Sequence, residues 1–254
     1  MHSSYRSPEG WDSLNNVIIH NREKNQLIVA FSGTWNVPQL IDEIADSRFV
    51  DYELHPVQNG SAMEYFYKHY INGFRTQFVK DFKDALEHSN PTEIVFTGHS
   101  LGGSIVLHAA LDMVLGGVLD QTKQTIKIYT YGQPRISNYE LEHEFAKRDI
   151  TLYRLVHHRD IVAHLPPCNV FGEGEGCSKD GKVGPFPYHP PTEIFYDSDF
   201  VEYKECDHKE GEDMSCSNGI IDFGLFEHNW YFNIPVGGCD DIIVTPGAPK
   251  FLNQ

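Results

Sequence analysis

The sequence predicts an α/β fold in which helices cover both faces of a mostly parallel central sheet. Strand-like and helix-like segments alternate over most of the chain, which is typical of such sheets. A strand-like run, a tight turn around Ser100 and an apolar helix follow one another over residues 93–115. The chain has 254 residues, of which 40% are hydrophobic, so it is long enough to form one domain over residues 1–254.

The first segments predict an antiparallel pair of strands followed by two helices. Residues 16–20 (NVIIH) and 26–32 (QLIVAFS) are apolar runs on either side of the polar turn NREKN, a pattern typical of a hairpin. Residues 36–49 carry apolar side chains every three or four positions, which predicts an amphipathic helix. Residues 64–87 show a second helical pattern that stops before Ser-Asn-Pro, because proline disfavours helix continuation.

The second half supplies the parallel strands and the helices between them. We expect strands at 93–97, 126–131 and 152–157, with helices at 101–115 and 139–148. From about residue 166 to 224 the pattern gives way to Gly, Pro, Cys and acidic residues. Within that stretch we expect only a pair of strands, at 193–196 and 201–205.

The charge of the chain excludes two classes of partner. It has 36 Asp and Glu against 20 Lys and Arg, a net charge of -16, which repels nucleic-acid phosphates and anionic membranes. Neutral lipid is compatible with this charge, because docking on an uncharged surface depends on apolar area. No apolar run reaches the length that a transmembrane helix needs. We therefore expect neither nucleic acid nor a transmembrane segment.

The cysteines indicate an oxidising compartment, because all of them lie in one Gly- and Pro-rich part of the chain. They are Cys168, Cys177, Cys206, Cys216 and Cys239. The first two and the next two are the economical local pairs, which leaves the last without a partner. The first residues lack the apolar core of a secretory signal, so the cysteines alone suggest an extracellular location. A zinc site including His189 and His208 is the alternative, but no C-x-x-C pair is present, and we expect no metal or cofactor.

The sequence Gly98-His-Ser100-Leu-Gly102 predicts a nucleophilic serine. In the motif G-x-S-x-G the serine lies on a sharp turn between a strand and a helix, with its hydroxyl above the sheet. The glycines are needed because side chains at these positions would collide with the neighbouring strand and helix. Chance alone would produce the motif in roughly one chain in twelve of this length. Its position between a strand and an apolar helix makes it more specific.

A serine nucleophile needs a histidine base that is oriented by a carboxylate. In this order of elements the acid and then the histidine follow the serine. Asp160 comes just after the strand at 152–157, although a loop or helix-cap aspartate is the ordinary alternative. The histidines that follow it are His164, His189, His208 and His228. We favour His228, which lies late in the chain beside an aromatic cluster; a core histidine is the alternative for it.

Taken together, four segments resemble the signature blocks of the class 3, fungal-type triacylglycerol lipases, which have the α/β-hydrolase fold. The segments are GHSLGG at 98–103, YGQPR at 131–135, DIVAHLPP at 160–167 and HNWYF at 228–232. The resemblance extends over about residues 27–239. It implies that Ser100, Asp160 and His228 form a catalytic triad and that the backbone N–H groups of Thr34 and Leu101 bind the oxyanion.

The resemblance has two further implications. Residues 36–49 occupy the position of the family's lid. Members of the family also have more chain before the oxyanion strand, including a helix and a cysteine that bonds to the equivalent of Cys239. We therefore expect this sequence to be N-terminally truncated relative to the family.

The expected function is hydrolysis of acylglycerol esters at an oil–water interface through an acyl-serine intermediate. A phospholipase, a galactolipase or a general carboxylesterase on the same scaffold is the alternative among enzymes. A catalytically silent lipid-binding protein is less expected, because Ser100, Asp160, His228 and the glycines beside the serine are all present. We expect no protein partner.

Overall fold

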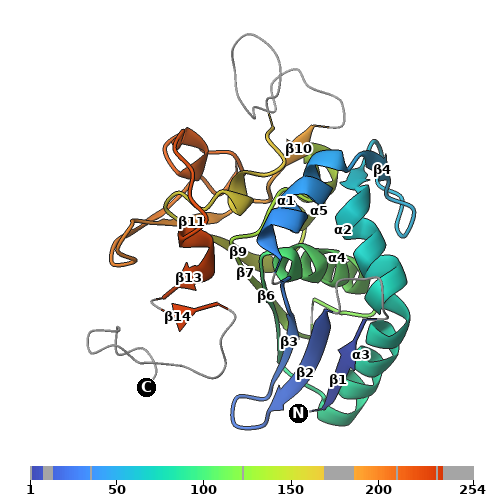
Figure 1. Ribbon diagram of the computed structural model, residues 1–254. Helices are drawn as coiled ribbons and strands as arrows, with labels where there is room; N and C mark the ends of the chain where they lie inside the picture. Colours follow the sequence, from blue (N-terminus) through green and yellow to red (C-terminus); the bar gives the residue numbers. More distant parts are fainter. Residues whose placement is uncertain are drawn as a thin grey trace.

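An eight-stranded sheet forms the centre of the protein (Figure 1). The computed structural model describes residues 2–7, 14–34, 36–121, 123–168, 186–209, 211–232 and 234–236. The sheet has the order β1-β2-β3-β6-β7-β9-β11-β12. Its strands are β1 (Ser3–Arg6), β2 (Asn15–Asn21), β3 (Gln26–Phe31), β6 (Glu93–His99), β7 (Thr125–Tyr131), β9 (Ile150–His157), β11 (Glu193–Tyr196) and β12 (Tyr203–Glu205).

The pairing of the strands confirms a mostly parallel sheet. The five strands from β3 to β11 run parallel to one another. The pairs β1-β2, β2-β3 and β11-β12 are antiparallel, so the predicted hairpin and the predicted late strand pair are both present. Because the central strands are parallel, their carboxyl ends meet at one edge of the sheet, where a site can form.

Two smaller sheets consist of short strands that the sequence pattern did not reveal. One has the order β10-β8-β5-β4 and the other pairs β13 with β14. These strands are β4 (Phe49–Asp51), β5 (Ser61–Met63), β8 (Ser137–Asn138), β10 (Pro187–Tyr188), β13 (Trp230–Tyr231) and β14 (Ile234–Pro235). Segments of two or three residues are too short to show a recognisable alternation of apolar and polar side chains.

α-Helices occur at all four predicted places, and two of them divide the pattern expected at 64–87. They are α1 (Val37–Asp46), α2 (Glu64–Lys68), α3 (Thr76–Ser89), α4 (Leu101–Leu115) and α5 (Tyr139–Ala146). Short 3-10 turns also occur at η2 (Val162–His164), η3 (Ser217–Gly219) and η4 (Glu227–Asn229). Among the described residues, no helix combines the length and the apolar character that crossing a membrane requires.

A π-helical segment, η1 (His69–Arg75), joins α2 to α3 without a break. The apolar side chains of this helix recur every fourth residue, at Phe66, Tyr70, Phe74, Phe78 and Phe82. An α-helix has 3.6 residues per turn, so a strict spacing of four would gradually rotate away from the core. The wider π turn compensates for this drift, and each of the five is at most 1% exposed.

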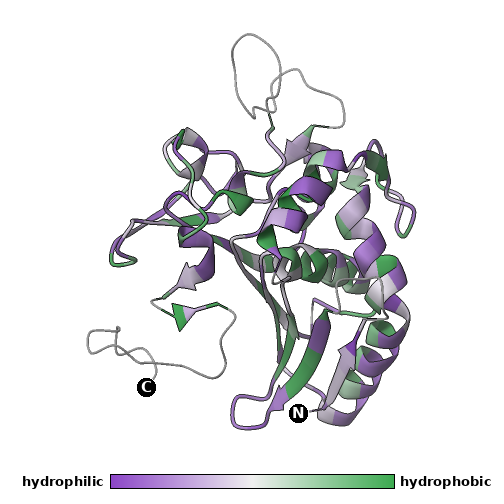
Figure 2. Cartoon of the chain, in the orientation of Figure 1, coloured by the Kyte–Doolittle hydropathy of each residue, from purple (hydrophilic) through white to green (hydrophobic). Residues whose placement is uncertain are grey.

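The larger helices of the described ranges pack on one face of the central sheet. Side chains of α3, α4 and α5 share a single buried cluster with Val29, Phe96 and Ile128, which alternate along the sheet strands. Figure 2 shows α4 as mostly hydrophobic, and every residue from Leu101 to Val114 is buried. The opposite face bears Tyr129 and, through Leu155, meets Tyr231 of β13. The α/β-hydrolase fold is confirmed, but the described residues do not form the expected second helical layer.

The helix α5 carries a buried carboxyl group. Glu142 is 1% exposed, and its Oε1 accepts a hydrogen bond of 2.5 Å from the Ser137 hydroxyl. Its Oε2 has no hydrogen-bond partner within the described part of the chain. Burial raises the pKa of Glu142 to about 8, because the apolar surroundings disfavour the charged form. The carboxyl is therefore mainly protonated at neutral pH.

We expect Glu142→Gln to flatten the decrease of the melting temperature between about pH 5 and pH 8. The folded protein keeps the Glu142 proton up to a pKa of about 8, whereas the ordinary value is 4.5. The stability that this group contributes is therefore fully present below the unfolded pKa and is lost as the pH rises towards 8. Thermal unfolding followed by circular dichroism at each pH measures the slope.

Glu144→Gln is the matched control on the same helix. Burial opposes ionisation of Glu144, but hydrogen bonds from Lys147 and Arg148 lower its pKa below the ordinary value. This variant should therefore keep the slope between pH 5 and pH 8. An unchanged slope in Glu142→Gln would show that the buried carboxyl does not carry the proton.

Candidate active site

The predicted turn at Ser100 lies between β6 and α4 at the carboxyl edge of the sheet. Ser100 has φ 56° and ψ -128°, a conformation that non-glycine residues rarely adopt. Its N–H donates to the Tyr131 carbonyl at 2.8 Å. A Cβ atom on Gly98 would lie 2.4 Å from the Gly102 backbone, and one on Gly102 would lie 2.2 Å from the Phe31 carbonyl oxygen. The two glycines therefore allow the close packing that holds the strained serine.

The structure brings Ser100, His228 and Asp160 together. His228 Nε2 lies 2.9 Å from Ser100 Oγ, and His228 Nδ1 lies 2.9 Å and 3.0 Å from the two carboxylate oxygens of Asp160. All three residues are 0% exposed. They come from three separate segments, namely the β6–α4 turn, the loop after β9 and the turn η4. The histidine is thus positioned to accept the serine proton while the carboxylate orients its ring.

Further hydrogen bonds hold the Asp160 carboxylate in place. Its Oδ1 accepts from the Val162 N–H at 2.9 Å, and its Oδ2 accepts from the Tyr231 hydroxyl at 2.7 Å. Burial would raise the pKa of Asp160, but the charge of His228 and the hydrogen bonds from His228 and Tyr231 lower it to about 2. The carboxylate is therefore ionised at neutral pH. Sequence reasoning did not identify Tyr231, whose only signal is its position three residues after His228.

His99, the residue before the serine, contacts His228 through both its Nε2 atom and its ring. Its Nε2 lies 2.8 Å from the His228 carbonyl oxygen, and the two rings are 4.5 Å apart. Burial and then the charge of His228 lower the pKa of His99 to about 3, so its ring is neutral. A neutral ring with its proton on Nε2 donates to that carbonyl. The sequence gives no signal for this role, because the motif G-x-S-x-G leaves the residue between Gly98 and Ser100 unspecified.

Gly132 provides the space in which Asp160, His228 and Tyr231 meet. It has φ +55°, and a Cβ atom there would lie 2.5 Å from Asp160 Oδ2, 2.9 Å from His228 Nδ1 and 3.0 Å from the Tyr231 hydroxyl. Any side chain would therefore separate the acid from the histidine. The only sequence signal for this role was the Tyr131-Gly-Gln-Pro-Arg segment.

The other candidate histidines do not reach Ser100. His164 Nδ1 lies 2.7 Å from the Asp160 carbonyl oxygen, and its Nε2 lies 2.8 Å from the Ser217 carbonyl oxygen. His189 is buried against Glu212 and the Gln133 carbonyl. His208 is exposed, 4.0 Å from Glu205. His164 is thus a structural partner of the Asp160 loop.

The residues expected to bind the oxyanion lie beside the serine. β3 ends at Phe31, and a Cβ atom on Gly33 would lie 3.3 Å from Ser100 Cβ. Leu101 is the first residue of α4, where backbone N–H groups lack partners within the helix. A cavity of about 250 Å³ opens here, lined by Phe31, Ser32, Gly33, Thr34, Val37, His99, Asn229 and Val236. The cavity thus lies between the start of α1 and the end of η4.

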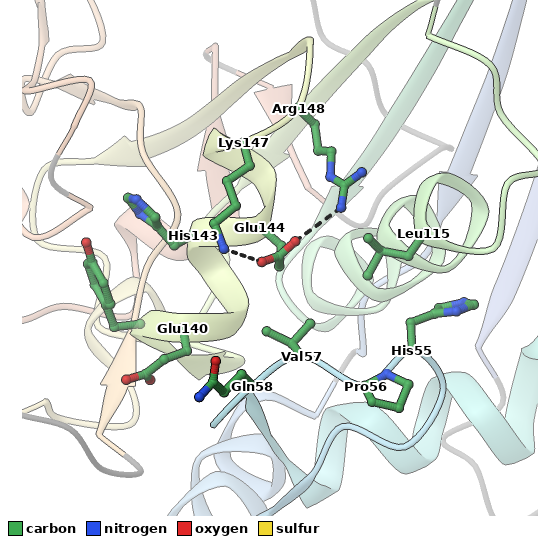
Figure 3. Close-up of a pocket in the computed structure, with 11 residues that line it drawn as sticks. His55, Pro56, Val57, Gln58, Leu115, Glu140, His143, Glu144, Lys147 and Arg148 are labelled. Atoms are coloured by element: carbon green, nitrogen blue, oxygen red, sulfur yellow. Dashed lines mark hydrogen bonds and ion pairs between the residues drawn. The ribbon is translucent and has the colours of Figure 1, made fainter.

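A larger cavity, of about 500 Å³, lies between α5 and residues 55–58. Its lining includes no member of the triad (Figure 3). Its two cations, Lys147 and Arg148, bind the same carboxylate, Glu144, at 2.5 Å and 3.2 Å. Because their charges are already paired, this cavity offers no free cation to an anionic ligand.

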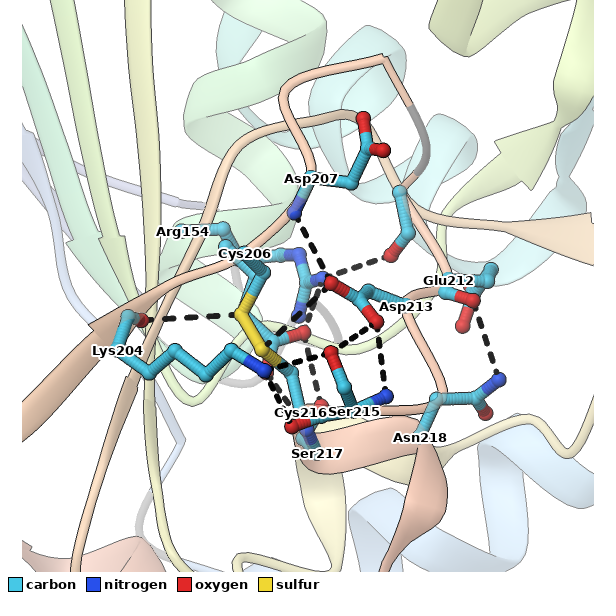
Figure 4. The surroundings of a disulfide bond; sticks show 12 residues. Arg154, Lys204, Cys206, Asp207, Glu212, Asp213, Ser215, Cys216, Ser217 and Asn218 are labelled. Atoms are coloured by element: carbon cyan, nitrogen blue, oxygen red, sulfur yellow. Dashed lines mark hydrogen bonds and ion pairs between the residues drawn. A yellow bond between two sulfur atoms is a disulfide. The ribbon is translucent and has the colours of Figure 1, made fainter.

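The predicted disulfide between Cys206 and Cys216 is present (Figure 4). The sulfur atoms lie near Glu193, but they are bonded to each other and are therefore not free thiolates for zinc. Within the described part of the chain, neither His189 nor His208 lies in this group. Cys177, the expected partner of Cys168, and Cys239 lie outside the described residues.

Buried ion pairs fix the segment that this disulfide closes. Arg135 binds Glu212 at 2.8 Å, and Arg154 binds Glu193 at 2.7 Å, with all four side chains at most 3% exposed. Glu193 in turn accepts from the Ser217 N–H at 2.9 Å. The residues around this disulfide are thereby joined to β9 through Arg154 and to Arg135, which follows β7.

Comparisons with known proteins agree with this geometry. The model of the family "Lipase (class 3)" matches residues 28–170, more than half of the chain. The chain is 28% identical to a lipase of Caenorhabditis elegans over 88% of this chain and 68% of that protein. It is 29% identical to a lipase of Rhizopus niveus over 89% of this chain and 52% of that one, so it spans about half the length of this relative. The structure of lipase II from Rhizopus niveus matches with a TM-score of 0.76 at 25% identity, covering 92% of this chain and 80% of the other.

Proposed function

Because this chain belongs to the class 3 lipase family, we propose that it hydrolyses acylglycerol esters with Ser100, His228 and Asp160 as catalytic residues. One observation carries the proposal: Ser100 Oγ, His228 and Asp160 form an unbroken series of contacts of 2.9–3.0 Å. The ionised carboxylate and the buried setting suit this series to proton transfer at neutral pH. Hydrolysis of esters by such a triad needs no metal or cofactor.

The chemistry follows from the order of these contacts. His228 Nε2 takes the proton of Ser100 as Oγ attacks the ester carbonyl carbon, and the resulting imidazolium is stabilised by Asp160. The alcohol then leaves with the proton held by His228, and Ser100 keeps the acyl group as an ester. Water, deprotonated by His228, attacks this ester and releases the fatty acid. Ser100 recovers its proton from His228.

The oxyanion is proposed to bind the backbone N–H groups of Thr34 and Leu101. Two facts support this assignment: the segment that follows β3 packs against the serine at Gly33, and Leu101 begins α4 directly after Ser100. Fixed N–H donors stabilise the negative charge that develops on the carbonyl oxygen without having to reorganise. Removing one such donor costs about 10²- to 10³-fold in known serine hydrolases.

A movement is required before a lipid can reach the serine, because Ser100 is 0% exposed. We propose that α1 is the lid. Its Leu40 and Ile44 are each 1% exposed, whereas Asp42 and Asp46 lie on the opposite, polar side. Val37 of the same helix lines the cavity beside the serine. On opening, α1 can exchange its apolar contacts with the protein for apolar contacts with lipid at small net cost.

We expect hydrolysis of a partly soluble triglyceride to rise steeply once droplets form, and Ile41→Asp to reduce this rise. Ile41 is only partly buried against the core. An aspartate there should therefore destabilise the closed form less than it destabilises the open form in contact with lipid. A charge on the apolar side of α1 disfavours its insertion into lipid. Initial rates measured across the solubility limit, with tributyrin and with a short soluble ester, test the prediction.

Gln39→Asp is the matched control, since it adds the same charge on the exposed side of α1. It should leave the rise unchanged. A rate that saturates smoothly through the solubility limit, with or without Ile41→Asp, would indicate an esterase. No hydrolysis of any ester by the full chain would contradict the catalytic proposal itself.

We also propose an extracellular location. The Cys206–Cys216 disulfide supports it, because such bonds persist mainly in oxidising compartments.

A further inference from the structure

We propose that the segment 221–226 is a permanently exposed docking surface for uncharged lipid. We call Ile221, Phe223, Leu225 and Phe226 the apolar rim. The inference rests on the proposed function for the identity of the lipid, but it concerns adsorption and not catalysis. It assigns to the rim a role separate from that of α1.

The rim exposes an unusual amount of apolar surface. Ile221 is 94% exposed, Phe226 67%, Phe223 45% and Leu225 43%. Four of six consecutive residues are therefore large apolar side chains in contact with water. Single exposed apolar residues are ordinary, but a contiguous exposed group marks an interaction site.

The rim lies beside two members of the triad. Gly224 forms a parallel β-bridge with Asp160, and its N–H donates to the Arg159 carbonyl at 2.8 Å. The ring of Phe223 lies 4.6 Å from that of His164. Phe226 comes immediately before η4, which carries His228. A lipid surface on the rim would therefore lie next to the site and not on a remote face.

The rim is held in this exposed position by its neighbours. Arg159 binds Asp222 at 2.7 Å and Glu227 at 3.0 Å. The Asn229 side chain donates to the Leu225 carbonyl at 3.1 Å, and Phe226 stacks on Trp230 at 5.8 Å. These contacts fix the segment and still leave Ile221 and Phe226 mostly exposed. A preordered surface of this kind loses little conformational freedom on binding.

Charge identifies the lipid as uncharged. Asp222 of this segment and the adjoining Glu227 share one cation, Arg159, so the rim presents no cationic group to an anionic headgroup. The chain as a whole has a net charge of -16, which repels anionic surfaces. An acylglycerol droplet has no charge and a large apolar surface, and it therefore fits the rim.

The rim and α1 differ in the state that the structure describes. Leu40 and Ile44 of α1 are buried while Ser100 is covered, whereas the rim is already exposed. Adsorption through the rim can therefore precede opening of α1. It would bring α1 and the cavity beside Val37 to the lipid surface in the closed form.

Flotation of the Ser100→Ala protein with triolein droplets measures adsorption without hydrolysis. Replacing Ile221 and Phe226 together by serine should lower the partition coefficient by about a hundredfold, because each removes a large apolar side chain from the contact. The matched control replaces Val201 and Tyr203, which are 75% and 64% exposed, by serine as well. It should change the partition coefficient less than about twofold.

The single variant Ile221→Ser is not expected to disturb folding, because this side chain is almost fully exposed. It should lower the partition coefficient by about tenfold. The inference would be overturned if the rim changes left adsorption unaffected or if the control pair reduced it equally. It would also be overturned if the protein adsorbed more strongly to phosphatidylserine vesicles than to triolein. If the wild type hydrolyses acylglycerols while the rim variants float normally, only the docking inference fails. If the rim variants lose adsorption but the wild type hydrolyses no ester, only the proposed function fails.

Discussion

Replacing Ser100 with alanine is expected to lower kcat for ester hydrolysis by about 10⁶-fold, as removal of the nucleophile does in other serine hydrolases. The strained turn, the oxyanion donors and the binding surface all remain. Hydrolysis should therefore still be about 10³ to 10⁴ times faster than the uncatalysed reaction in water. Rates with a soluble p-nitrophenyl ester measure the loss. A fluorophosphonate ester should label the wild-type protein at Ser100 and leave Ser100→Ala unlabelled.

Ser104→Ala provides the matched control for this variant. Ser104 lies one turn further along α4, is 0% exposed, and its hydroxyl has no partner among the described residues. Removing this hydroxyl should therefore change neither labelling nor rate by more than a few-fold. Comparable hydrolysis by Ser100→Ala would disprove the assignment of the nucleophile. Absence of labelling in the wild type would favour a catalytically silent lipid-binding protein.

Asp160→Asn is expected to lower kcat by up to about 10⁴-fold. The Val162 N–H donates to one oxygen of Asp160, so the asparagine carbonyl should occupy that position and the amide NH₂ the other. The NH₂ would then donate to His228 Nδ1 and favour the tautomer with its proton on Nε2. That tautomer cannot accept the proton of Ser100. Single-turnover rates with the soluble ester measure the effect on acylation.

Two variants test whether this loss is specific to the orientation of His228. Tyr231→Phe removes the 2.7 Å hydrogen bond to Asp160 but keeps the carboxylate, and it should cost about tenfold or less. His228→Ala should lower kcat about as much as Ser100→Ala does, whereas His164→Ala should mainly lower stability. If His164→Ala proved as damaging to kcat as His228→Ala, the contacts of His164 with the Asp160 loop would need a catalytic explanation.

The sequence predicted the central sheet and the grouping of Ser100, Asp160 and His228, because both can be derived from local patterns and from the order of the segments. The strand before Ser100 and the apolar helix after it are read from neighbouring residues, and the order serine, acid, histidine limited the choice of partners. The choice of His228 over His164 was also helped by the four signature segments. These features need no knowledge of which distant side chains touch.

The features that the sequence did not reveal depend on contacts between distant segments. Gly132 matters because Asp160 and His228 come from elsewhere to occupy the space beside it. His99 and Tyr231 act through atoms of segments far away in the chain. The helices of the described residues also share one face of the sheet, which an alternation of strands and helices cannot predict.

The members of the triad differ in the kind of structure that carries them. Ser100 and Asp160 follow long strands of the central sheet, whereas His228 lies in η4, next to a hairpin of two-residue strands. Short, peripheral elements open with less free energy than the core of a domain. We therefore expect the segment that carries the histidine to open with less free energy than the strands that lead to the serine. In a denaturant titration, activity should disappear before the far-ultraviolet signal of the sheet, and the amides of β6 and β9 should exchange with solvent long after those of β13.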